Sequence, residues 1–147
     1  MSAAMAQAQI ADLDDVLVLL GKVGLPIEGV RENFGSFLVA RDGGQLIGCV
    51  GLERYGQVAL LRSLAVAPDR QQGGVGRQLT ARLLEDARSE GVREVVLLTT
   101  TAADFFGRHF GFTPIARAQF DETFATSPEW HLPRCSSAAC LHLRLSE

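Results

Sequence analysis

The sequence predicts an α/β (α+β) fold built on one mixed, mostly antiparallel β-sheet with helices packed on it. Two observations carry this prediction. Strand-like apolar stretches separated by tight turns follow one another through residues 36–67, which is typical of an antiparallel meander. The last of these stretches, at 58–67, is followed by a glycine-rich turn, an amphipathic helix and another buried strand at 92–98. A strand–helix–strand order places a crossover helix on the sheet and makes one parallel step.

Before the crossover helix, the chain is expected to form a helical segment and the meander. In chain order, the predicted elements are a strand at 6–10, helices at 13–22 and 27–34, and strands at 36–41, 46–53 and 58–67. Apolar residues recur at helical spacing in the first helix, for which Asp12 is the expected N-cap. Asp42-Gly43-Gly44-Gln45 is expected to close the first hairpin, and Arg54-Tyr55-Gly56-Gln57 the second.

The crossover helix has its apolar stripe at Leu79, Leu83 and Ala87, and Gly91 is expected to end it. Two further strands and another helix complete the sheet. The elements predicted after the crossover are a strand at 92–98, a helix at 102–110, a strand at 113–117, a helical turn at 119–125, an irregular stretch at 126–137 and a last strand at 138–145.

Composition places the chain among ordinary globular proteins, with 147 residues, 47% hydrophobic and 21% charged. The net charge is −3 and both signs are interspersed, so neither a nucleic acid nor a membrane surface is an expected partner. No apolar run approaches the ~20 residues that cross a bilayer. Residues 1–9 also lack the pattern of a signal peptide.

The three cysteines predict neither a disulfide framework nor a zinc site. Cys135 and Cys140 have no histidine pair at zinc spacing, so no metal is expected, and Cys49 lies in an apolar stretch where a small buried side chain fits. An odd number of cysteines without a signal peptide indicates a reducing compartment, and the cytoplasm is the expected location.

The glycine-rich turn reads Gln71-Gln72-Gly73-Gly74-Val75-Gly76. Glycine lets a backbone approach a ligand closely, and the start of a helix offers unpaired N–H groups and the positive end of its dipole. Such a turn suits the pyrophosphate of a nucleotide-like cofactor. Arg77-Gln78 stands where a P-loop requires Lys-Ser/Thr, and Leu79 where a dinucleotide fingerprint requires a small residue.

What remains is Q-x-x-G-x-G, behind a strand that ends in Leu-Ala-Val-x-Pro at 64–68. This pattern resembles the acyl-CoA-binding motif of the GNAT superfamily of N-acetyltransferases, and the order of predicted elements is similar to that fold over essentially the whole chain. The resemblance implies a single domain over residues 1–147, whose two central strands splay apart to receive acetyl-CoA. The residues that it implies for cofactor binding are Leu64, Ala65, Val66, Gln71, Gln72, Gly73, Gly74, Val75, Gly76, Arg77 and Phe106.

The resemblance also implies a base, because a free α-amino group has a pKa of about 8 and must lose a proton before it attacks. Many members of the family place a glutamate on the central strand, but residues 58–67 contain no carboxylate. Glu53, at the end of the preceding strand, is the candidate, acting directly or through a water; the alternative is a solvated charge beside a turn. The tyrosine that commonly protonates the CoA thiolate is absent from 105–112, where His109 is either a substitute or a packing residue.

Arg62 interrupts an otherwise apolar strand. Strand alternation is expected to place it on the face of Leu60, Leu64 and Val66. A buried guanidinium requires a partner. One candidate is the carboxylate of an amino-acid substrate, and the alternative is an internal salt bridge, with Glu53 as a candidate.

Two short motifs narrow the resemblance. Leu-Thr-Thr at 98–100, a Phe-rich helix and Gly-Phe-x-Pro at 111–114 resemble the acetyltransferase domain of N-acetylglutamate synthases. Leu-Leu-Arg-Ser-Leu-Ala-Val at 60–66, with Ser-Ala-Ala-Cys at 137–140, resembles the small N-acetyltransferases of bacterial arsenic-resistance operons. Both imply acetyl transfer to the α-amine of a small amino acid, or of an organoarsenical or phosphinic analogue. Thr99 and Thr100 are candidates to bind its acidic group.

Other interpretations stay open at this point. The acceptor can instead be a polyamine, an aminoglycoside or a protein N-terminus, or the chain can be a non-catalytic acyl-CoA-binding module. Cys135 and Cys140 either pack or form a site for trivalent arsenic. By analogy with the family, a homodimer that pairs through the last strand is also expected.

Overall fold

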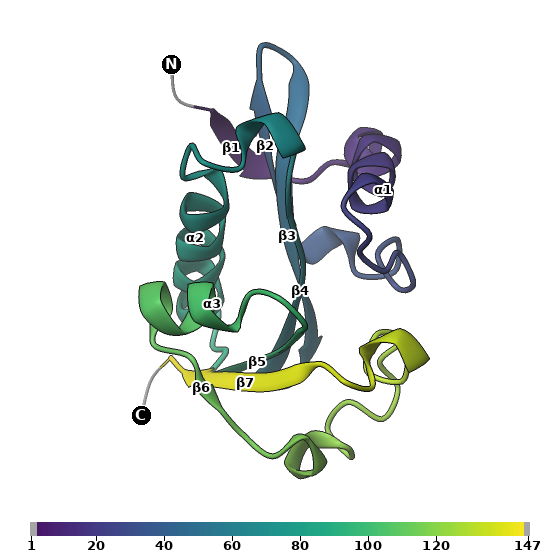
Figure 1. Cartoon of the computed structure of the whole chain (residues 1–147), viewed down its shortest axis with the longest axis vertical. Helices are drawn as coiled ribbons and strands as arrows, with labels where there is room; N and C mark the ends of the chain where they lie inside the picture. The colour runs from purple at the N-terminus through teal and green to yellow at the C-terminus, as the bar shows by residue number, and fades with distance from the viewer. Residues whose placement is uncertain (1–2, 146–147) are drawn as a thin grey trace.

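The computed structural model describes residues 3–145 and contains one seven-stranded sheet (Figure 1). Its strands are β1 (Ala4–Gln7), β2 (Phe37–Asp42), β3 (Gln45–Tyr55), β4 (Val58–Val66), β5 (Glu94–Thr99), β6 (Thr113–Pro114) and β7 (Ala139–Arg144). Their spatial order is β1-β2-β3-β4-β5-β7-β6, in which β4 and β5 are parallel and all other neighbours antiparallel. The predicted fold class, including its parallel step, is confirmed.

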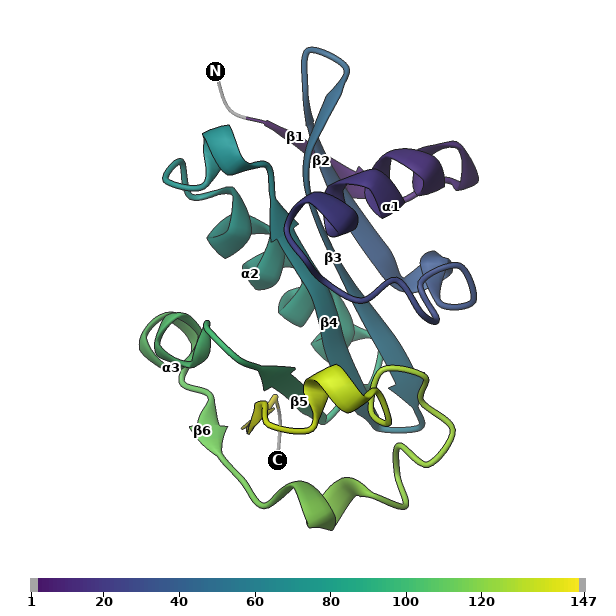
Figure 2. The same ribbon diagram turned by 45° about the vertical axis from the view of Figure 1, so that its right-hand side comes forward.

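Three α-helices pack on this sheet. They are α1 (Leu13–Lys22), α2 (Val75–Ser89) and α3 (Ala103–Phe110). Figures 1 and 2 show α2 on one face of β2–β4 and α1 on the opposite face. The predicted stripe of Leu79, Leu83 and Ala87 is buried, and Gly91 lies just beyond the helix end with a positive φ of 94°. None of the helices in residues 3–145 combines the length and the apolar composition of a membrane span.

The predicted helix at 27–34 is wrong. The segment forms turns and ends in a 3-10 turn at Phe34–Ser36. Gly29 has a φ of 83°, which a right-handed helix cannot accommodate. A Cβ at Gly29 would lie 2.9 Å from Cγ of Pro128, so this turn lies directly against the segment that precedes β7.

Other element boundaries also differ from the predictions. The first strand lies at Ala4–Gln7 rather than 6–10, and the strand at 113–117 shortens to Thr113–Pro114. The helical turn at 119–125 is a 3-10 turn at Arg117–Phe120 followed by irregular turns. Asp12 occupies the N-cap position of α1 as predicted, but its side chain makes no capping hydrogen bond; the carboxylate instead accepts the Gln9 N–H and binds Arg41.

The two central strands pair over only part of their length. The β4–β5 register ends at Leu61 opposite Leu97, although β4 continues to Val66 and β5 to Thr99. Beyond Leu61, β4 therefore keeps only its β3 neighbour. The splayed strands implied by the resemblance are present, and they open at the edge of the sheet where β4 leads toward the glycine-rich turn.

A β-bulge accompanies this opening. The β3–β4 pairs on its two sides are Arg62 with Gly51 and Ala65 with Cys49. β4 thus contains one residue more than β3 between them. Ser63 lies in the bulge with a φ of 64°, the positive value that non-glycine residues rarely adopt.

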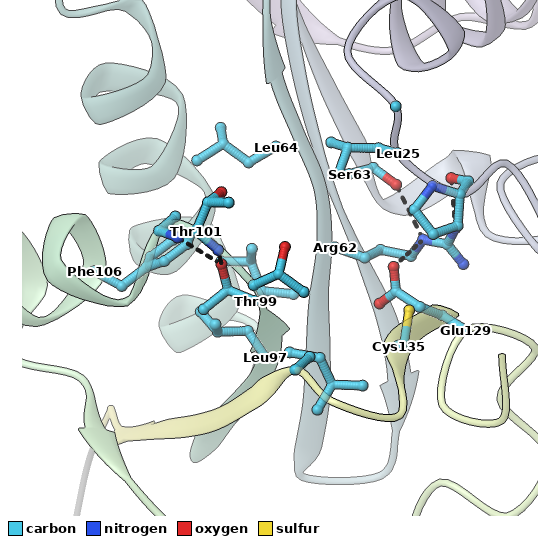
Figure 3. Close-up of a pocket in the computed structure, with 17 residues that line it drawn as sticks. Leu25, Arg62, Ser63, Leu64, Leu97, Thr99, Thr101, Phe106, Glu129 and Cys135 are labelled. Carbon is cyan, nitrogen blue, oxygen red and sulfur yellow. Dashed lines mark hydrogen bonds and ion pairs between the residues drawn. The ribbon is translucent and has the colours of Figure 1, made fainter. Parts of the chain in front are cut away.

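The bulge overturns one prediction about Arg62. It shifts the side-chain alternation by one residue, so Arg62 stays on the face of Leu60 but not on that of Leu64 and Val66. Arg62 contacts Pro26 on the α1 side of the sheet, and Leu64 projects on the other side of the strand (Figure 3). Strand periodicity cannot reveal such a shift, because it assumes an uninterrupted strand.

The packing of the sheet yields a stability test. A Cβ at Gly51 would lie 2.2 Å from Cε1 of Phe37, its cross-strand partner, so Gly51→Ala is expected to lower the free energy of unfolding by about 1–3 kcal/mol. A Cβ at Gly21 in α1 would have nothing within 4 Å, and Gly21→Ala is expected to raise stability by about 0.5–1 kcal/mol. Urea unfolding measures both. Equal stability of Gly51→Ala and wild type would contradict this packing.

Candidate active site

A pocket of about 250 Å³ opens where β4 and β5 part. One side is formed by the end of β5, the following threonines and Phe106 of α3. The other side is formed by Arg62 and Ser63 of β4, the loop at 24–26 and the segment before β7. Figure 3 shows these two sides, with Thr99 and Phe106 facing Arg62, Glu129 and Cys135 across β4. The pocket therefore joins the splayed strands to a buried charged cluster.

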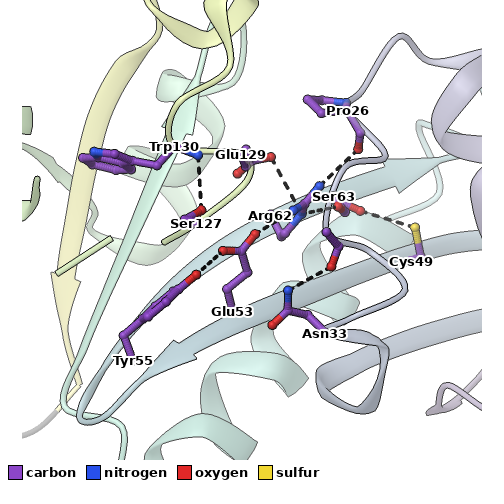
Figure 4. Close-up of polar contacts among 11 residues, drawn as sticks. Pro26, Asn33, Cys49, Glu53, Tyr55, Arg62, Ser63, Ser127, Glu129 and Trp130 are labelled. Carbon is purple, nitrogen blue, oxygen red and sulfur yellow. Dashed lines mark hydrogen bonds and ion pairs between the residues drawn. The ribbon is translucent and has the colours of Figure 1, made fainter. Parts of the chain in front are cut away.

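Arg62 is the centre of that cluster, and its side chain is fully buried (Figure 4). Its Nη1 donates to Oε2 of Glu53 at 2.6 Å and its Nη2 to the carbonyl of Pro26 at 3.2 Å. Its Nε donates to Oγ of Ser63 at 3.0 Å and lies 3.8 Å from Oε1 of Glu129. The internal salt bridge left open by the sequence is thus present. A guanidinium has five N–H donors, and three of them make these hydrogen bonds.

Glu53 lies inside β3 rather than at its end, because that strand continues to Tyr55. Its side chain is fully buried and accepts hydrogen bonds from Tyr55 Oη and Arg62 Nη1, both at 2.6 Å. Burial and the contact with Glu53 raise the pKa of Tyr55 to about 12. Glu53 is not among the residues that line the pocket. Its assignment as base stays a prediction, and its contacts make it the residue that holds Arg62 in place.

Glu129 was not predicted from the sequence, in which 126–137 has no regular pattern. Its side chain lines the pocket beside Arg62 and is only 8% exposed. Among the described residues that line the pocket, it is the one carboxylate. The sequence around Glu129, Ser-Pro before it and a tryptophan after it, indicates a turn that is anchored by a buried side chain. It does not indicate which part of the fold this turn packs against.

The turn that carries Glu129 is held by several contacts. The Trp130 N–H donates to Oγ of Ser127 at 3.2 Å, and its indole Nε1 donates to Asp121 at 3.0 Å. The guanidinium of Arg117 lies 4.8 Å from the Trp130 ring centroid and also donates to the Trp130 carbonyl. The ring of Phe124 packs 4.8 Å from that of Trp130, between centroids. These contacts fix Glu129 over Arg62.

Burial raises the pKa of Glu129 to about 7, against an ordinary value of 4.5. The neighbouring Arg62 charge lowers this pKa and the Glu53 charge raises it, but both effects are smaller than that of burial. The carboxyl group can therefore hold or release a proton near neutral pH.

The glycine-rich turn has the geometry of an anion-binding helix start. Gly74 has a left-handed φ of 83°, and Gln78 is the residue whose N–H first bonds back along the helix, to the Gly74 carbonyl at 3.0 Å. The preceding N–H groups in the first turn of α2 consequently have no intrahelical partner. Gly73 is the exception among the turn residues, because its N–H donates to the Arg70 carbonyl at 3.2 Å. The side chain of Gln71 donates to the Val66 carbonyl at 3.2 Å.

The remaining predicted cofactor and substrate residues fall into two groups. Leu64, Phe106, Thr99 and Thr100 line the pocket, whereas the other predicted cofactor residues lie along β4 and the turn. Oγ1 of Thr99 accepts the Ala102 N–H at 2.9 Å, so this threonine also orders the start of α3. These roles toward ligands stay predictions.

His109 is exposed and does not line the pocket; its ring packs edge-on against Phe105, with centroids 5.1 Å apart.

Of the cysteines, Cys49 is fully buried as predicted, and burial raises its pKa to about 12. Cys135 lines the pocket and Cys140 is buried. Within the part of the chain that is described, His, Cys, Asp and Glu do not form groups of three or more that could hold a metal ion.

The raised pKa of Glu129 generates a pH-dependent stability. Because the folded-state pKa exceeds the unfolded one, folding favours the protonated carboxyl; this stabilisation is complete below about pH 4.5 and is lost as the pH rises through about 7. Relative to wild type, Glu129→Gln should gain stability across that window, by on the order of 3 kcal/mol at most. Urea unfolding at pH 5 to 8 measures the difference, with the exposed Glu122→Gln as control. A difference between Glu129→Gln and wild type that does not vary with pH would refute the shift.

Comparison with known proteins agrees with this geometry. The model of the acetyltransferase (GNAT) family matches residues 11–112. An amino-acid acetyltransferase of Neisseria meningitidis is 27% identical in an alignment 126 residues long, which covers 80% of this chain and 29% of that protein. An uncharacterized N-acetyltransferase of Chlorobaculum tepidum is 33% identical over 97 residues, covering 65% of this chain and 61% of that protein. The chain thus spans less than a third of the meningococcal relative.

Among solved structures, N-acetylglutamate synthase from Neisseria gonorrhoeae, complexed with coenzyme A and N-acetyl-glutamate, has a TM-score of 0.83. It is 23% identical, and the match covers all of this chain and 36% of that one. At this identity the likeness establishes the fold. Together with the family model, which covers more than half of the chain, and with the splayed strands and glycine-rich turn, it leads to one conclusion: the chain belongs to the acetyltransferase (GNAT) family.

Proposed function

We propose that this chain transfers an acetyl group from acetyl-CoA to the α-amine of a small amino acid or amino-acid-like compound, organoarsenical and phosphinic analogues included. One observation carries the proposal: a single pocket joins the splayed end of β4 and β5 to a buried arginine and a buried carboxylate. The first feature suits a thioester arm, and the second suits an amino acid, which has one anionic and one cationic group.

The cofactor side of the proposal depends on backbone groups. The unpaired N–H groups at the start of α2 suit the pyrophosphate, and β4 beyond Leu61 has no β5 neighbour, so Leu64, Ala65 and Val66 are available to a pantetheine arm. Bound there, acetyl-CoA supplies the activated acyl group. A Cβ at Gly76 would lie in van der Waals contact with Val66, 3.4 Å from its Cγ2, so a larger side chain at this position would extend beside the end of β4 that is proposed to hold the arm.

The acceptor side of the proposal depends on Arg62. Its remaining N–H donors suit the acceptor's carboxylate or phosphinate in a charge-assisted contact, while Glu53 and Ser63 fix the guanidinium. Thr99 and Thr100, at the opposite side of the pocket, are proposed as further hydroxyl contacts.

Size and charge favour this acceptor over the alternatives. The pocket of about 250 Å³ is smaller than typical ligand pockets of ~300–1,000 Å³. It offers one arginine and one carboxylate among its described residues, whereas polyamines and aminoglycosides are polycations. The names of the relatives, amino-acid acetyltransferase and N-acetylglutamate synthase, support the same class of acceptor.

Three further expectations belong to the proposal. Residues 1–147 are proposed to act as one domain, in the cytoplasm; the three cysteines, all within the described residues, form no disulfide. A homodimer also stays a prediction. The structure gives it no support through the last strand, because β7 already pairs with β5 on one edge and with β6 on the other at Leu141 and His142.

The turn is tested by adding bulk at Gly76. Gly76→Val is expected to raise the Kd for acetyl-CoA at least about 10-fold, because the new side chain occupies the approach of the pyrophosphate and arm. Isothermal titration calorimetry measures the Kd. Ala81→Val, on an exposed position of the same helix, is the matched control. Unchanged affinity in Gly76→Val would place the cofactor elsewhere.

The reaction is tested by CoA release from acetyl-CoA across free amino acids and their phosphinic and arsenical analogues. We expect turnover with an acceptor that carries an acidic group beside its amine. Arg62→Ala would leave Glu53 buried without its cation, so the informative variant is Arg62→Met combined with Glu53→Gln. Its KM for the acceptor should rise roughly 10- to 100-fold, as expected for the loss of a charged hydrogen bond, while the Kd for acetyl-CoA stays within about 2-fold.

Arg54→Met is the control for this variant, because Arg54 pairs with Glu90 at the surface and lies outside the pocket. An acceptor KM that the double variant leaves unchanged would refute the role of Arg62. Acetyl-CoA binding without turnover on the whole panel would favour a binding module.

A further inference from the structure

We infer that Glu129 is the general base that takes a proton from the ammonium group of the acceptor. The inference rests on the proposed function and adds to it a catalytic residue that lies outside the central strand and outside the region matched by the family model. It assigns to Glu129 the role for which Glu53 was the candidate in the sequence.

The position of Glu129 is the main support for this role. It comes from the turn before β7, yet its carboxylate lies in the same pocket as Leu64 and Thr99, where the splayed strands open. Among the described lining residues no other side chain is a carboxylate, and the threonine and serine hydroxyls there are far weaker bases. A base must reach the proton it removes, and Glu129 is placed to do so in this pocket.

The contacts of Glu129 with the described side chains leave its carboxylate oxygens available. Among those side chains, its cationic partner is Arg62, whose Nε lies 3.8 Å from Oε1, beyond hydrogen-bond distance. That Nε donates to Ser63 instead. The charge of Arg62 therefore orients the Glu129 carboxylate without forming a hydrogen bond to it. The carboxylate can accept a hydrogen bond from an ammonium group instead.

Glu53 differs in each of these respects. Its carboxylate is fully buried, accepts two short hydrogen bonds from Tyr55 and Arg62, and does not line the pocket. These contacts make Glu53 a positioning residue: it holds the guanidinium in the place from which Arg62 faces both Glu129 and the acceptor.

Protonation chemistry supports the assignment. Burial brings the pKa of Glu129 to about 7, which is close to the value that makes a base effective near neutral pH. Among the described residues, the titratable and charged groups that face it are Arg62 on β4, Glu53 on β3 and the Cys135 thiol in the same pocket wall. Tyr55, hydrogen bonded to Glu53, completes the cluster.

Proton removal and acetyl transfer balance without a further reactant. The Glu129 carboxylate accepts one proton from the acceptor's –NH₃⁺, leaving a neutral amine. The nitrogen forms a bond to the thioester carbonyl carbon, and the carbon–sulfur bond breaks with its electron pair on sulfur. The surplus proton on the newly bonded nitrogen passes through solvent to the thiolate, giving the amide and the CoA thiol. Glu129 then releases its own proton to water.

The test compares Glu129→Gln, Glu129→Asp and Glu53→Gln, with Glu122→Gln as a charge-matched control on an exposed position of the same segment. Steady-state rates are measured from pH 5.5 to 9.5 with the acceptor selected from the panel, and the Kd for acetyl-CoA is measured for each variant. Glu129→Gln should lower kcat at pH 7 by at least about 100-fold, the usual contribution of a general base, without changing the Kd.

The pH profile separates catalysis from structure. In Glu129→Gln the residual rate should rise with pH until the acceptor's own amine deprotonates, because the amine then needs no base. Glu129→Asp should recover part of the rate at pH 7. If Glu129 had a purely structural role, Glu129→Gln would keep the shape of the wild-type pH–rate profile. Glu129→Asp would then not recover the rate at pH 7.

Different outcomes separate the inference from the function on which it rests. Full activity and an unchanged pH profile in Glu129→Gln, with activity lost in Glu53→Gln, would overturn the inference and restore Glu53 as base. If the wild-type protein binds acetyl-CoA but releases no CoA with any acceptor, the proposed function is overturned and the inference with it. ¹³C NMR of protein labelled at the glutamate carboxyl carbons gives a readout that needs no acceptor. The signal that disappears in Glu129→Gln belongs to Glu129 and should titrate near pH 7. Titration of this signal near the ordinary glutamate pKa of 4.5 would contradict the inference.

Discussion

The irregularity in the middle of β4 is the constraint on which the rest of this structure depends. One extra residue, with Ser63 in a backbone conformation that side chains disfavour, separates the part of β4 that pairs with β5 from the part that does not. A regular strand would continue the parallel ladder and close the opening. It would also place Arg62 and Leu64 on one face. The bulge instead directs Arg62 toward the α1 face and Leu64 toward the other side of the strand. Residues 62–64 therefore contribute side chains to both sides of the pocket.

Burying a charge cluster beside this opening is costly, and the fold compensates with contacts from distant parts of the chain. Glu53, the Pro26 carbonyl and Ser63 satisfy Arg62. The turn at 128–131 closes over it, and Gly29 makes the tight contact with Pro128 that brings the two loops together. Isolated ions of either sign would be unfavourable there. As a group they form a buried, preorganised site, in which electrostatic interactions are stronger than in water.

The backbone-determined parts of the fold and site were predictable from the sequence. The hairpins, the crossover helix and the glycine-rich turn follow from turn chemistry and apolar periodicity, which are local properties. The separation of Arg62 from the face of Leu64 and Val66 was not predictable, because the identity of Ser63 gives no indication of its positive φ. Glu129 was missed for a different reason: its place depends on how Trp130 and Arg117 dock an irregular segment, which is a tertiary property. The predicted helix at 27–34 is wrong for a similar reason, because Gly29 adopts a positive φ where it packs against Pro128, and this contact is not visible in the local sequence.

The anchoring of that segment has a spectroscopic consequence. The sequence contains one tryptophan, and it is Trp130, the residue directly after Glu129. Trp130 is 2% exposed; its indole lies beside the guanidinium of Arg117 and is hydrogen bonded to Asp121. The tryptophan fluorescence of the protein therefore originates beside the pocket, in the turn that carries the lining residue Glu129. Ultraviolet emission, without any added label, reports on the environment of that turn as ligands enter and as the neighbouring carboxyl changes its charge.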